Sequence, residues 1–182
     1  NKMENTSRFN FSEWPLDLLV DYVLKVHHRR VREKGPGTLS LINKVMMENL
    51  VLDEVEQLFS QSLSDLDTHL MKEERVLFPY ILDLYDAVRS GQPIAPMHCG
   101  TVRNPINVMM SDHDAELQRH ERIATLLNDY QAPADASEDY KELMRQLSEF
   151  RENLKEHTHV ENDIIFPKAI EMEASRFDGQ NL

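Results

Sequence analysis

Cysteine is scarce in this sequence, which has Cys99 alone among its 182 residues. A single cysteine excludes an intramolecular disulfide, and it excludes zinc or iron–sulfur sites built from several thiolates. Such low cysteine usage is typical of proteins in reducing compartments, so we expect a cytoplasmic protein. Cys99 falls between Pro96 and Gly100 in a predicted loop, and we interpret it as incidental rather than as a nucleophile.

Long apolar runs and clusters of positive charge are also missing. No segment reaches the roughly 20 apolar residues of a transmembrane helix, so no membrane partner is expected. The formal net charge of −12, without a basic stripe, argues against a nucleic-acid partner. With 41% apolar residues the chain can bury a hydrophobic core, and we expect one domain over residues 1–182, with its core at about 14–173.

Glycine occurs at only five positions, which we interpret, together with the prolines, as breaks between helices. The intervening segments carry apolar residues at helical spacing and lack the alternation typical of strands. Four helical segments are predicted, over about 15–34, 38–89, 105–131 and 136–173. Because short connections make neighbouring helices antiparallel, we predict an all-α, up-down-up-down four-helix bundle.

The motif His-x-x-x-Glu occurs twice, each time with Phe-Pro beginning five residues after the glutamate. It comprises His69 with Glu73 and His157 with Glu161. Residues four apart on a helix project from one face, so both side chains of a pair can reach the same metal ion. We infer two helical hairpins that each contribute half of a metal site. Each proline is expected to kink or end its helix one to two turns past the glutamate.

The histidine–glutamate pairs lie on apolar stripes that are predicted to face the core. A carboxylate on such a stripe is costly to bury unless it is paired or binds a cation. Two glutamates and several histidines in this setting favour a pair of metal ions, with glutamate bridging and histidine in terminal positions. Three histidines lie on their stripes: His69, His113 and His157.

Helical geometry separates the other histidines from this site. His159 is two residues from His157 and so faces sideways or outward. His120 lies seven residues beyond His113, which is about 10.5 Å along the axis and too far to bind the same pair of ions. We therefore expect a supporting or packing role for His120. His98 is expected to be exposed in the loop that contains Cys99.

Four phrases, in order along the chain, carry a family resemblance. They are His27-His28 with Arg32-Glu33, His69 to Glu74 leading to Phe78-Pro79, Asn104-Pro105 leading to Asp112-His113, and His157 to Asn162 leading to Phe166-Pro167. Over roughly Trp14 to Ile170 the sequence resembles the hemerythrin-like domain. More narrowly, it resembles the di-iron proteins for repair of iron centres.

The resemblance implies a set of metal ligands. In the first helix, helical angle alone slightly prefers His27, which lies nearer the centre of the apolar arc than His28. In the family the first ligand stands five residues before the glutamate of the Arg-Glu pair, which implies His28. The implied site holds two non-haem iron ions that share an oxo or hydroxo bridge and bridging carboxylates. Its ligands are His28, His69, His113, His157, Glu73 and Glu161.

The resemblance also implies a function and partners. Family members restore iron–sulfur clusters damaged by nitric oxide or oxidants, so iron–sulfur proteins would be clients that receive iron. A diatomic molecule, nitric oxide or dioxygen, would bind at the site. Whether nitric oxide is reduced or only bound, and whether the chain forms a homodimer, are left open. The N-terminal cysteine-containing domain of many relatives is not expected here, and residues 41–53 lack a histidine that many relatives have.

The same residues leave alternative functions open. A dioxygen-binding or nitric-oxide-sensing hemerythrin-like protein is the main alternative. True hemerythrins use a fifth histidine from an HxxxH pair on the third helix, where this sequence has Leu117 four residues after His113. A structural zinc site is a third reading. A ferritin-like oxidase is disfavoured, because that architecture uses Glu-x-x-His.

Overall fold

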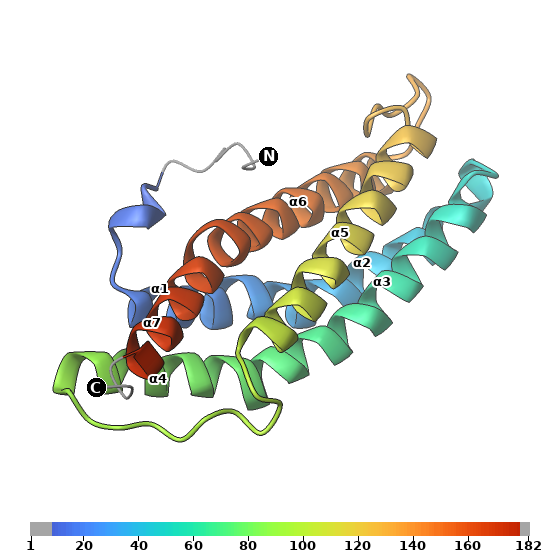
Figure 1. Cartoon of the computed structure of the whole chain (residues 1–182). Coiled ribbons are helices and arrows are strands. Elements are labelled where there is room, and N and C mark those ends of the chain that lie inside the picture. Colours follow the sequence, from blue (N-terminus) through green and yellow to red (C-terminus); the bar gives the residue numbers. More distant parts are fainter. Residues whose placement is uncertain (1–8, 179–182) are drawn as a thin grey trace.

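The computed structural model describes residues 9–178, and the side chains of residues 9–176. Four long helical rods dominate the part of the chain that is described (Figure 1). The first rod contains α1 (Leu16–Tyr22), η2 (Val23–His28) and α2 (Arg29–Val45), and the second contains α3 (Leu52–Lys72), η4 (Glu73–Leu77) and α4 (Phe78–Ser90). The third is α5 (Arg103–Leu126), and the fourth contains α6 (Glu138–Val160), η5 (Glu161–Ile165) and α7 (Phe166–Asp178). Two short 3₁₀ turns, η1 (Phe11–Glu13) and η3 (Met46–Glu48), flank the first rod.

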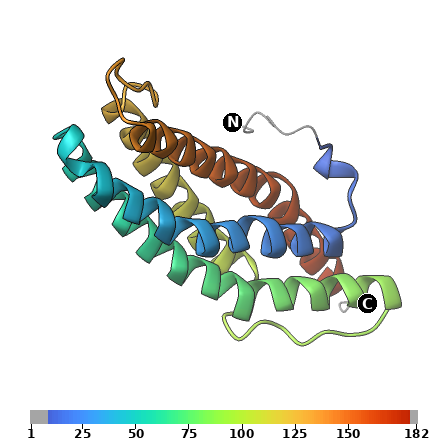
Figure 2. The ribbon, with the colours of Figure 1, turned by 180° about the vertical axis from the view of Figure 1, so that it is seen from behind.

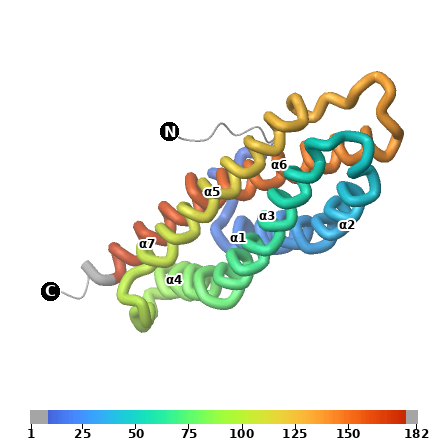
Figure 3. The backbone as a smooth tube through the Cα atoms, turned by 90° about the vertical axis from the view of Figure 1, so that its right-hand side faces the viewer, coloured from blue at the N-terminus to red at the C-terminus, as the bar shows by residue number. Residues whose placement is uncertain are grey.

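Successive rods run antiparallel, as the views in Figures 1, 2 and 3 show. Helix α2 packs against α3 and α6, and α5 packs against the same two helices, which closes a four-membered ring. Residues 9–178 contain no strand. The predicted all-α, up-down-up-down bundle is therefore confirmed. No helix in this range combines the length and apolar character needed to cross a membrane.

One predicted helix boundary is wrong. The sequence predicted a break at Gly35-Pro36-Gly37, but α2 continues through these residues, and the turn to α3 comes after η3 instead. A Cβ atom on Gly35 would lie 2.6 Å from Cδ2 of Leu63, so this glycine allows α2 to approach α3 closely. The glycine therefore serves helix packing rather than chain reversal, and packing outweighs its low helix propensity. The third and fourth segments also differ at their ends: α5 ends five residues before Gln131, and α7 extends five residues past the predicted end at residue 173.

The two Phe-Pro pairs do not end their helices. Each is preceded by one π turn, η4 or η5, that begins at the glutamate of the His-x-x-x-Glu motif. The backbone N–H of Phe78 donates to the carbonyl of Glu73, and that of Phe166 donates to Glu161. A wide turn with i→i+5 hydrogen bonds thus stands where each helix was predicted to kink or end, and such turns are common at functional sites. A third π turn, η2, ends at His28.

The buried apolar side chains form two separate clusters. The first apolar cluster lies where α1, α4 and α7 meet, and it includes Phe11, Val20, Leu77, Phe78, Met109, Val160, Ile164 and Phe166. The second apolar cluster lies among α2, α3, α5 and α6, and it includes Val31, Phe59, Leu66, Leu70, Ile123, Phe150 and Leu154. Six buried histidines and glutamates fall between the two clusters, and apolar side chains enclose them along the bundle axis: His28, His69, Glu73, His113, His157 and Glu161.

Candidate metal centre

Each rod places polar residues at the same level of the bundle. On the fourth rod, Leu154 belongs to the second apolar cluster and Val160 to the first, and His157 lies between them. On the third rod, His113 lies between Met109 and Leu117. Met109 belongs to the first apolar cluster, and Leu117 packs against the second apolar cluster. The first and second rods repeat this order around their own polar residues. None of the six residues proposed from the sequence is more than 2% exposed: His28, His69, Glu73, His113, His157 and Glu161.

The polar groups of these six residues converge. One ligand atom from each of five of them lies within 4.8 Å of the others, and the five are His69, Glu73, His113, His157 and Glu161. Nε2 of His69 lies 3.0 Å from Oε1 of Glu73. Nε2 of His113 lies 3.4 Å from Oε1 of Glu161, and Nε2 of His157 contacts the same oxygen. His28 joins the group through Glu73, since its Nε2 lies 3.0 Å from Oε2 of that carboxylate.

Most of the converging atoms have no hydrogen-bond partner. Nε2 of His69, His113 and His157, Oε1 of Glu73 and both carboxylate oxygens of Glu161 are buried and make no hydrogen bond of acceptable geometry. Leaving such groups unsatisfied costs about 1–3 kcal/mol each, so native proteins rarely do it without a ligand. Imidazole nitrogens and carboxylate oxygens are ligands of transition metals. The residues therefore fit a cation that accepts these lone pairs.

The outer nitrogens of three histidines are held by hydrogen bonds. Nδ1 of His28 donates to Glu74 at 2.9 Å, Nδ1 of His69 to Asp112 at 3.2 Å, and Nδ1 of His113 to Asn162 at 2.8 Å. These bonds turn each Nε2 lone pair inward, as in known metal sites. These three acceptors were not predicted from the sequence, although each is next to a site residue in the chain. Adjacency was the signal that could have found them.

The structure separates the two neighbouring histidines of the first rod. His28 faces Glu73, whereas Nε2 of His27 donates to Glu156 at 2.9 Å and its ring stacks on His157 with centroids 5.5 Å apart. Both residues lie in the π turn η2, which holds more residues per turn than an α-helix. An angle of 100° per residue therefore does not describe how these two side chains are oriented, and the two histidines face different neighbours.

The negative charges of Glu73 and Glu161 affect how strongly the histidines of the cluster hold a proton. Burial lowers the pKa of His157, but Glu161 and Glu73 outweigh burial and raise it to about 10. Burial likewise lowers the pKa of His69, and Glu73 shifts it to a net rise. Burial raises the pKa of Glu73, while His69, His157 and His28 bring it well below the usual range. The carboxylates thus attract positive charge, which protons on imidazole or a metal cation can supply.

The remaining histidines lie outside the cluster. His120 is buried one layer away, where its Nε2 lies 2.8 Å from the hydroxyl of Ser62. Nδ1 of His159 donates to Asp163 at 2.8 Å, and His98 is exposed in the loop before α5. Glu116 is also buried and accepts a hydrogen bond from the Ser62 hydroxyl, a polar contact that was not predicted from the sequence.

Most of the chain, including the six site residues, matches a known protein family. Residues 19–169 match the hemerythrin HHE cation-binding domain. The chain belongs to this family. A buried cluster of histidine and glutamate in the middle of the matched region agrees with the cation binding for which the family is described.

Several relatives of the chain carry a more specific name. It is 33% identical to the iron-sulfur cluster repair protein YtfE of Musicola paradisiaca, over 94% of this chain and 73% of that protein. It is 33% identical to a probable iron-sulfur cluster repair protein of Haemophilus influenzae, over 84% of this chain and 64% of that protein. It is 29% identical to the YtfE protein of Escherichia coli O81, over 86% and 67% of the two chains. The predicted resemblance to the repair family is confirmed.

Proposed function

We propose that the buried cluster holds two iron ions. His28, His69, His113 and His157 would be terminal ligands, and the carboxylates of Glu73 and Glu161 would bridge the ions. The observation that carries this proposal is the set of unpaired, inward-facing nitrogen and oxygen atoms in a fully buried place. Nitrogen and carboxylate donors without thiolate suit iron and related metals.

We further propose that the protein repairs iron–sulfur clusters by supplying iron to damaged iron–sulfur proteins. The names of its relatives support this function. So does the charge of the site, because four neutral imidazoles and two carboxylates contribute only two negative charges to two cations. A site that leaves this much positive charge can bind an anion or a diatomic molecule such as nitric oxide, and it can release an iron. The low cysteine content supports a reducing compartment such as the cytoplasm as the location of this proposed function.

Iron loading followed by transfer tests both proposals. The purified protein is reconstituted with ferrous iron and its metal content is measured by elemental analysis. It is then mixed with a purified [4Fe–4S] hydratase that nitric oxide has inactivated. We expect about two irons per chain, and recovery of hydratase activity that depends on that iron.

Two variants of the fourth rod make this test specific. Glu161→Gln keeps the size of the side chain but removes a bridging carboxylate, so we expect it to lose iron and repair activity together. His159→Gln is the matched control, because His159 bonds Asp163 rather than the cluster. Full iron content in Glu161→Gln would refute the bridging role. Repair without bound iron would refute iron donation.

A dioxygen carrier is the less favoured function. The position that would supply a fifth histidine is Leu117, which packs against the second apolar cluster. A stable, reversible oxygenated spectrum of the iron-loaded protein would favour this alternative over repair.

A further inference from the structure

A row of aromatic rings connects the metal centre to the protein surface. The His27 ring stacks on His157 at 5.5 Å, with an interplanar angle of 9°. Tyr22 meets His27 edge-on at 5.1 Å, and Trp14 meets Tyr22 edge-on at 5.3 Å. Trp14, the single tryptophan of the chain, is half-buried, and it contacts Phe9, which is 36% exposed. Ring contacts therefore lead without a gap from a proposed iron ligand to solvent.

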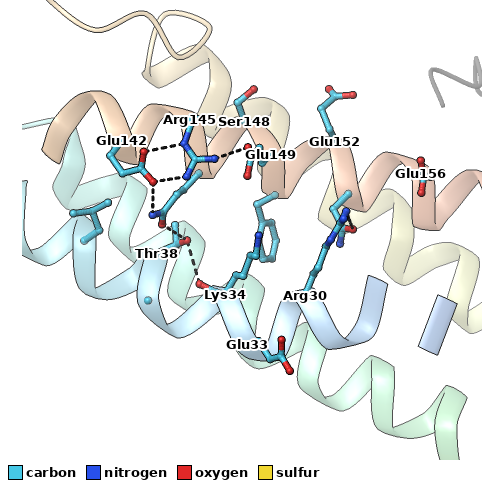
Figure 4. Close-up of a pocket in the computed structure, with 15 residues that line it drawn as sticks. Arg30, Glu33, Lys34, Thr38, Glu142, Arg145, Ser148, Glu149, Glu152 and Glu156 are labelled. Carbon is cyan, nitrogen blue, oxygen red and sulfur yellow. Dashed lines mark hydrogen bonds and ion pairs between the residues drawn. The ribbon is translucent and has the colours of Figure 1, made fainter. Parts of the chain in front are cut away.

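The phenol of Tyr22 is positioned to lose and regain a proton. Its hydroxyl donates to Oε1 of Glu156 at 2.6 Å, and the same oxygen accepts from His27 at 2.9 Å. The Glu156 side chain is 21% exposed and lines one end of a groove of about 960 Å³ between α2 and α6 (Figure 4). The proton acceptor of Tyr22 is thus in touch with solvent, while the ring itself packs against His27 and Trp14.

We propose that Trp14 and Tyr22 form a one-electron relay that carries oxidising equivalents from the metal centre to the surface. The inference rests on the proposed di-iron site. It applies when a peroxide or dioxygen oxidises that iron beyond its resting state. An electron from the relay then reaches the centre before the buried ligands are oxidised.

Each step of the relay balances in electrons and protons. Tyr22 gives one electron to the oxidised iron through the rings of His27 and His157, and its phenol proton passes to Glu156. Trp14 then gives one electron to the Tyr22 radical, which takes its proton back from Glu156. The oxidised indole loses its N–H proton to water. A small soluble one-electron reductant, such as a thiol, returns an electron and a proton to Trp14.

Tyr80 supplies a matched comparison for this arrangement. Its phenol also donates to a buried glutamate, Glu173, at 3.1 Å. No ring contact among residues 9–176 joins Tyr80 to the histidines or to Trp14. A tyrosine–glutamate pair alone is therefore present at both places, whereas the chain of rings is present only at Tyr22. If the relay depends on that chain, Tyr22→Phe and Tyr80→Phe must differ.

The outer step can be tested without any metal. Pulse radiolysis in azide solution oxidises Trp14 in the metal-free protein, and the absorption of the tryptophan radical is followed in time. We expect first-order interconversion of the tryptophan and tyrosyl radicals at a rate independent of protein concentration, which reports electron exchange between the two rings. Tyr22→Phe should lose this conversion, and Tyr80→Phe should keep it. Unchanged first-order conversion in Tyr22→Phe would overturn the relay.

The inner step is tested on the iron-loaded protein. After mixing with hydrogen peroxide and rapid freezing, electron paramagnetic resonance should show an organic radical in the wild type and in Tyr80→Phe. The signal should be lost in Tyr22→Phe, and peptide mass spectrometry should find more oxygen added near His157. Equal radical yield and equal oxidation in both variants would overturn the relay. Failure to load iron would refute the di-iron proposal and the inner step, while the radiolysis result still decides the outer step.

Discussion

Two buried polar clusters occupy successive layers of the bundle, and they differ in how their polar atoms are satisfied. The first polar cluster is the candidate metal centre. The second polar cluster contains Ser62, Glu116 and His120, two helical turns away along α3 and α5. The Ser62 hydroxyl lies 2.6 Å from Oε2 of Glu116 and 2.8 Å from Nε2 of His120, and Arg119 pairs with the same glutamate.

The contrast shows what marks a metal site within a folded chain. Both clusters combine histidine with glutamate in the core, so residue type and burial do not separate them. The second polar cluster contains a hydroxyl and a guanidinium that satisfy its carboxylate, and within it Nδ1 of His120 lacks a hydrogen-bond partner. The first polar cluster lacks both, and most of its inward atoms have no hydrogen-bond partner. A cluster whose carboxylate already has a guanidinium partner needs no added cation, whereas the candidate metal centre can take its positive charge from protons or from a metal cation.

The largest expected difference between the clusters is in metal binding. Glu73 lies beside His28, His69 and His157, so Glu73→Gln should weaken iron binding by more than about 100-fold, since even the outer partners of metal ligands are worth 10–100-fold. Glu116→Gln should leave iron content unchanged. Elemental analysis after reconstitution measures both. Loss of iron in Glu116→Gln would show that the two clusters are not independent.

The outer hydrogen bonds should have a smaller effect on the metal. Asn162→Ala removes the acceptor of His113 Nδ1, which lies 2.8 Å away, and should lower iron affinity about 10–100-fold. Competition with a chelator measures the affinity. Asp163→Ala is the control, because Asp163 bonds His159 outside the cluster. Equal affinity in the two variants would mean that Asn162 does not orient the ligand.

Removing the hydroxyl of the second polar cluster should lower the stability of the fold without changing metal binding. Ser62→Ala leaves the buried Glu116 and His120 without their shared partner, which should cost about 1–3 kcal/mol of unfolding free energy. Urea denaturation of the metal-free protein measures this loss. Ser64→Ala, on an exposed face of the same helix, should be close to neutral. A neutral Ser62→Ala would contradict a stabilising role for the hydroxyl.

The last expected effect is a pH dependence of stability that arises at His120. Burial, with Arg119 and Arg151, lowers the pKa of His120 to about 3. Between that value and the ordinary value near 6.5, the unfolded chain binds the proton and the folded chain does not. Stability is therefore full above pH 6.5 and falls as the pH drops toward 3, by at most about 1.4 kcal/mol per pH unit from this residue.

Replacing His120 tests this slope. His120→Leu should make the unfolding free energy of the metal-free protein less dependent on pH between 6.5 and 5, whatever its absolute stability. Urea titrations at several pH values give the slope directly. A slope equal to that of the wild type would show that His120 does not contribute.

Helical periodicity predicted the parts of this structure that depend on local pattern. The stripes of apolar residues placed His69, His113 and His157, with Glu73 and Glu161, toward the core, and all five are buried together. The break expected at Gly35 was wrong because the contact that explains this glycine comes from Leu63 on another helix. The bond between Ser62 and Glu116 spans 54 positions, so no local pattern could reveal it.

The choice between His27 and His28 shows a different limit. Spacing assumes one rotation per residue throughout a helix, and the turn at Val23–His28 breaks that assumption. Only the order of residues known from the family pointed to His28. Whether His28 is a ligand stays a prediction until its variant is assayed for metal.

The wide turns at Val23–His28, Glu73–Leu77 and Glu161–Ile165 set a condition for anyone who grafts this site onto an idealised scaffold. Relative to an α-helix, each turn acts as a one-residue insertion that shifts the phase of the helix that follows it. Copying the histidines and glutamates onto straight helices would keep their spacing but rotate the neighbouring core residues out of register. A working transplant must carry these backbone irregularities along with the side chains.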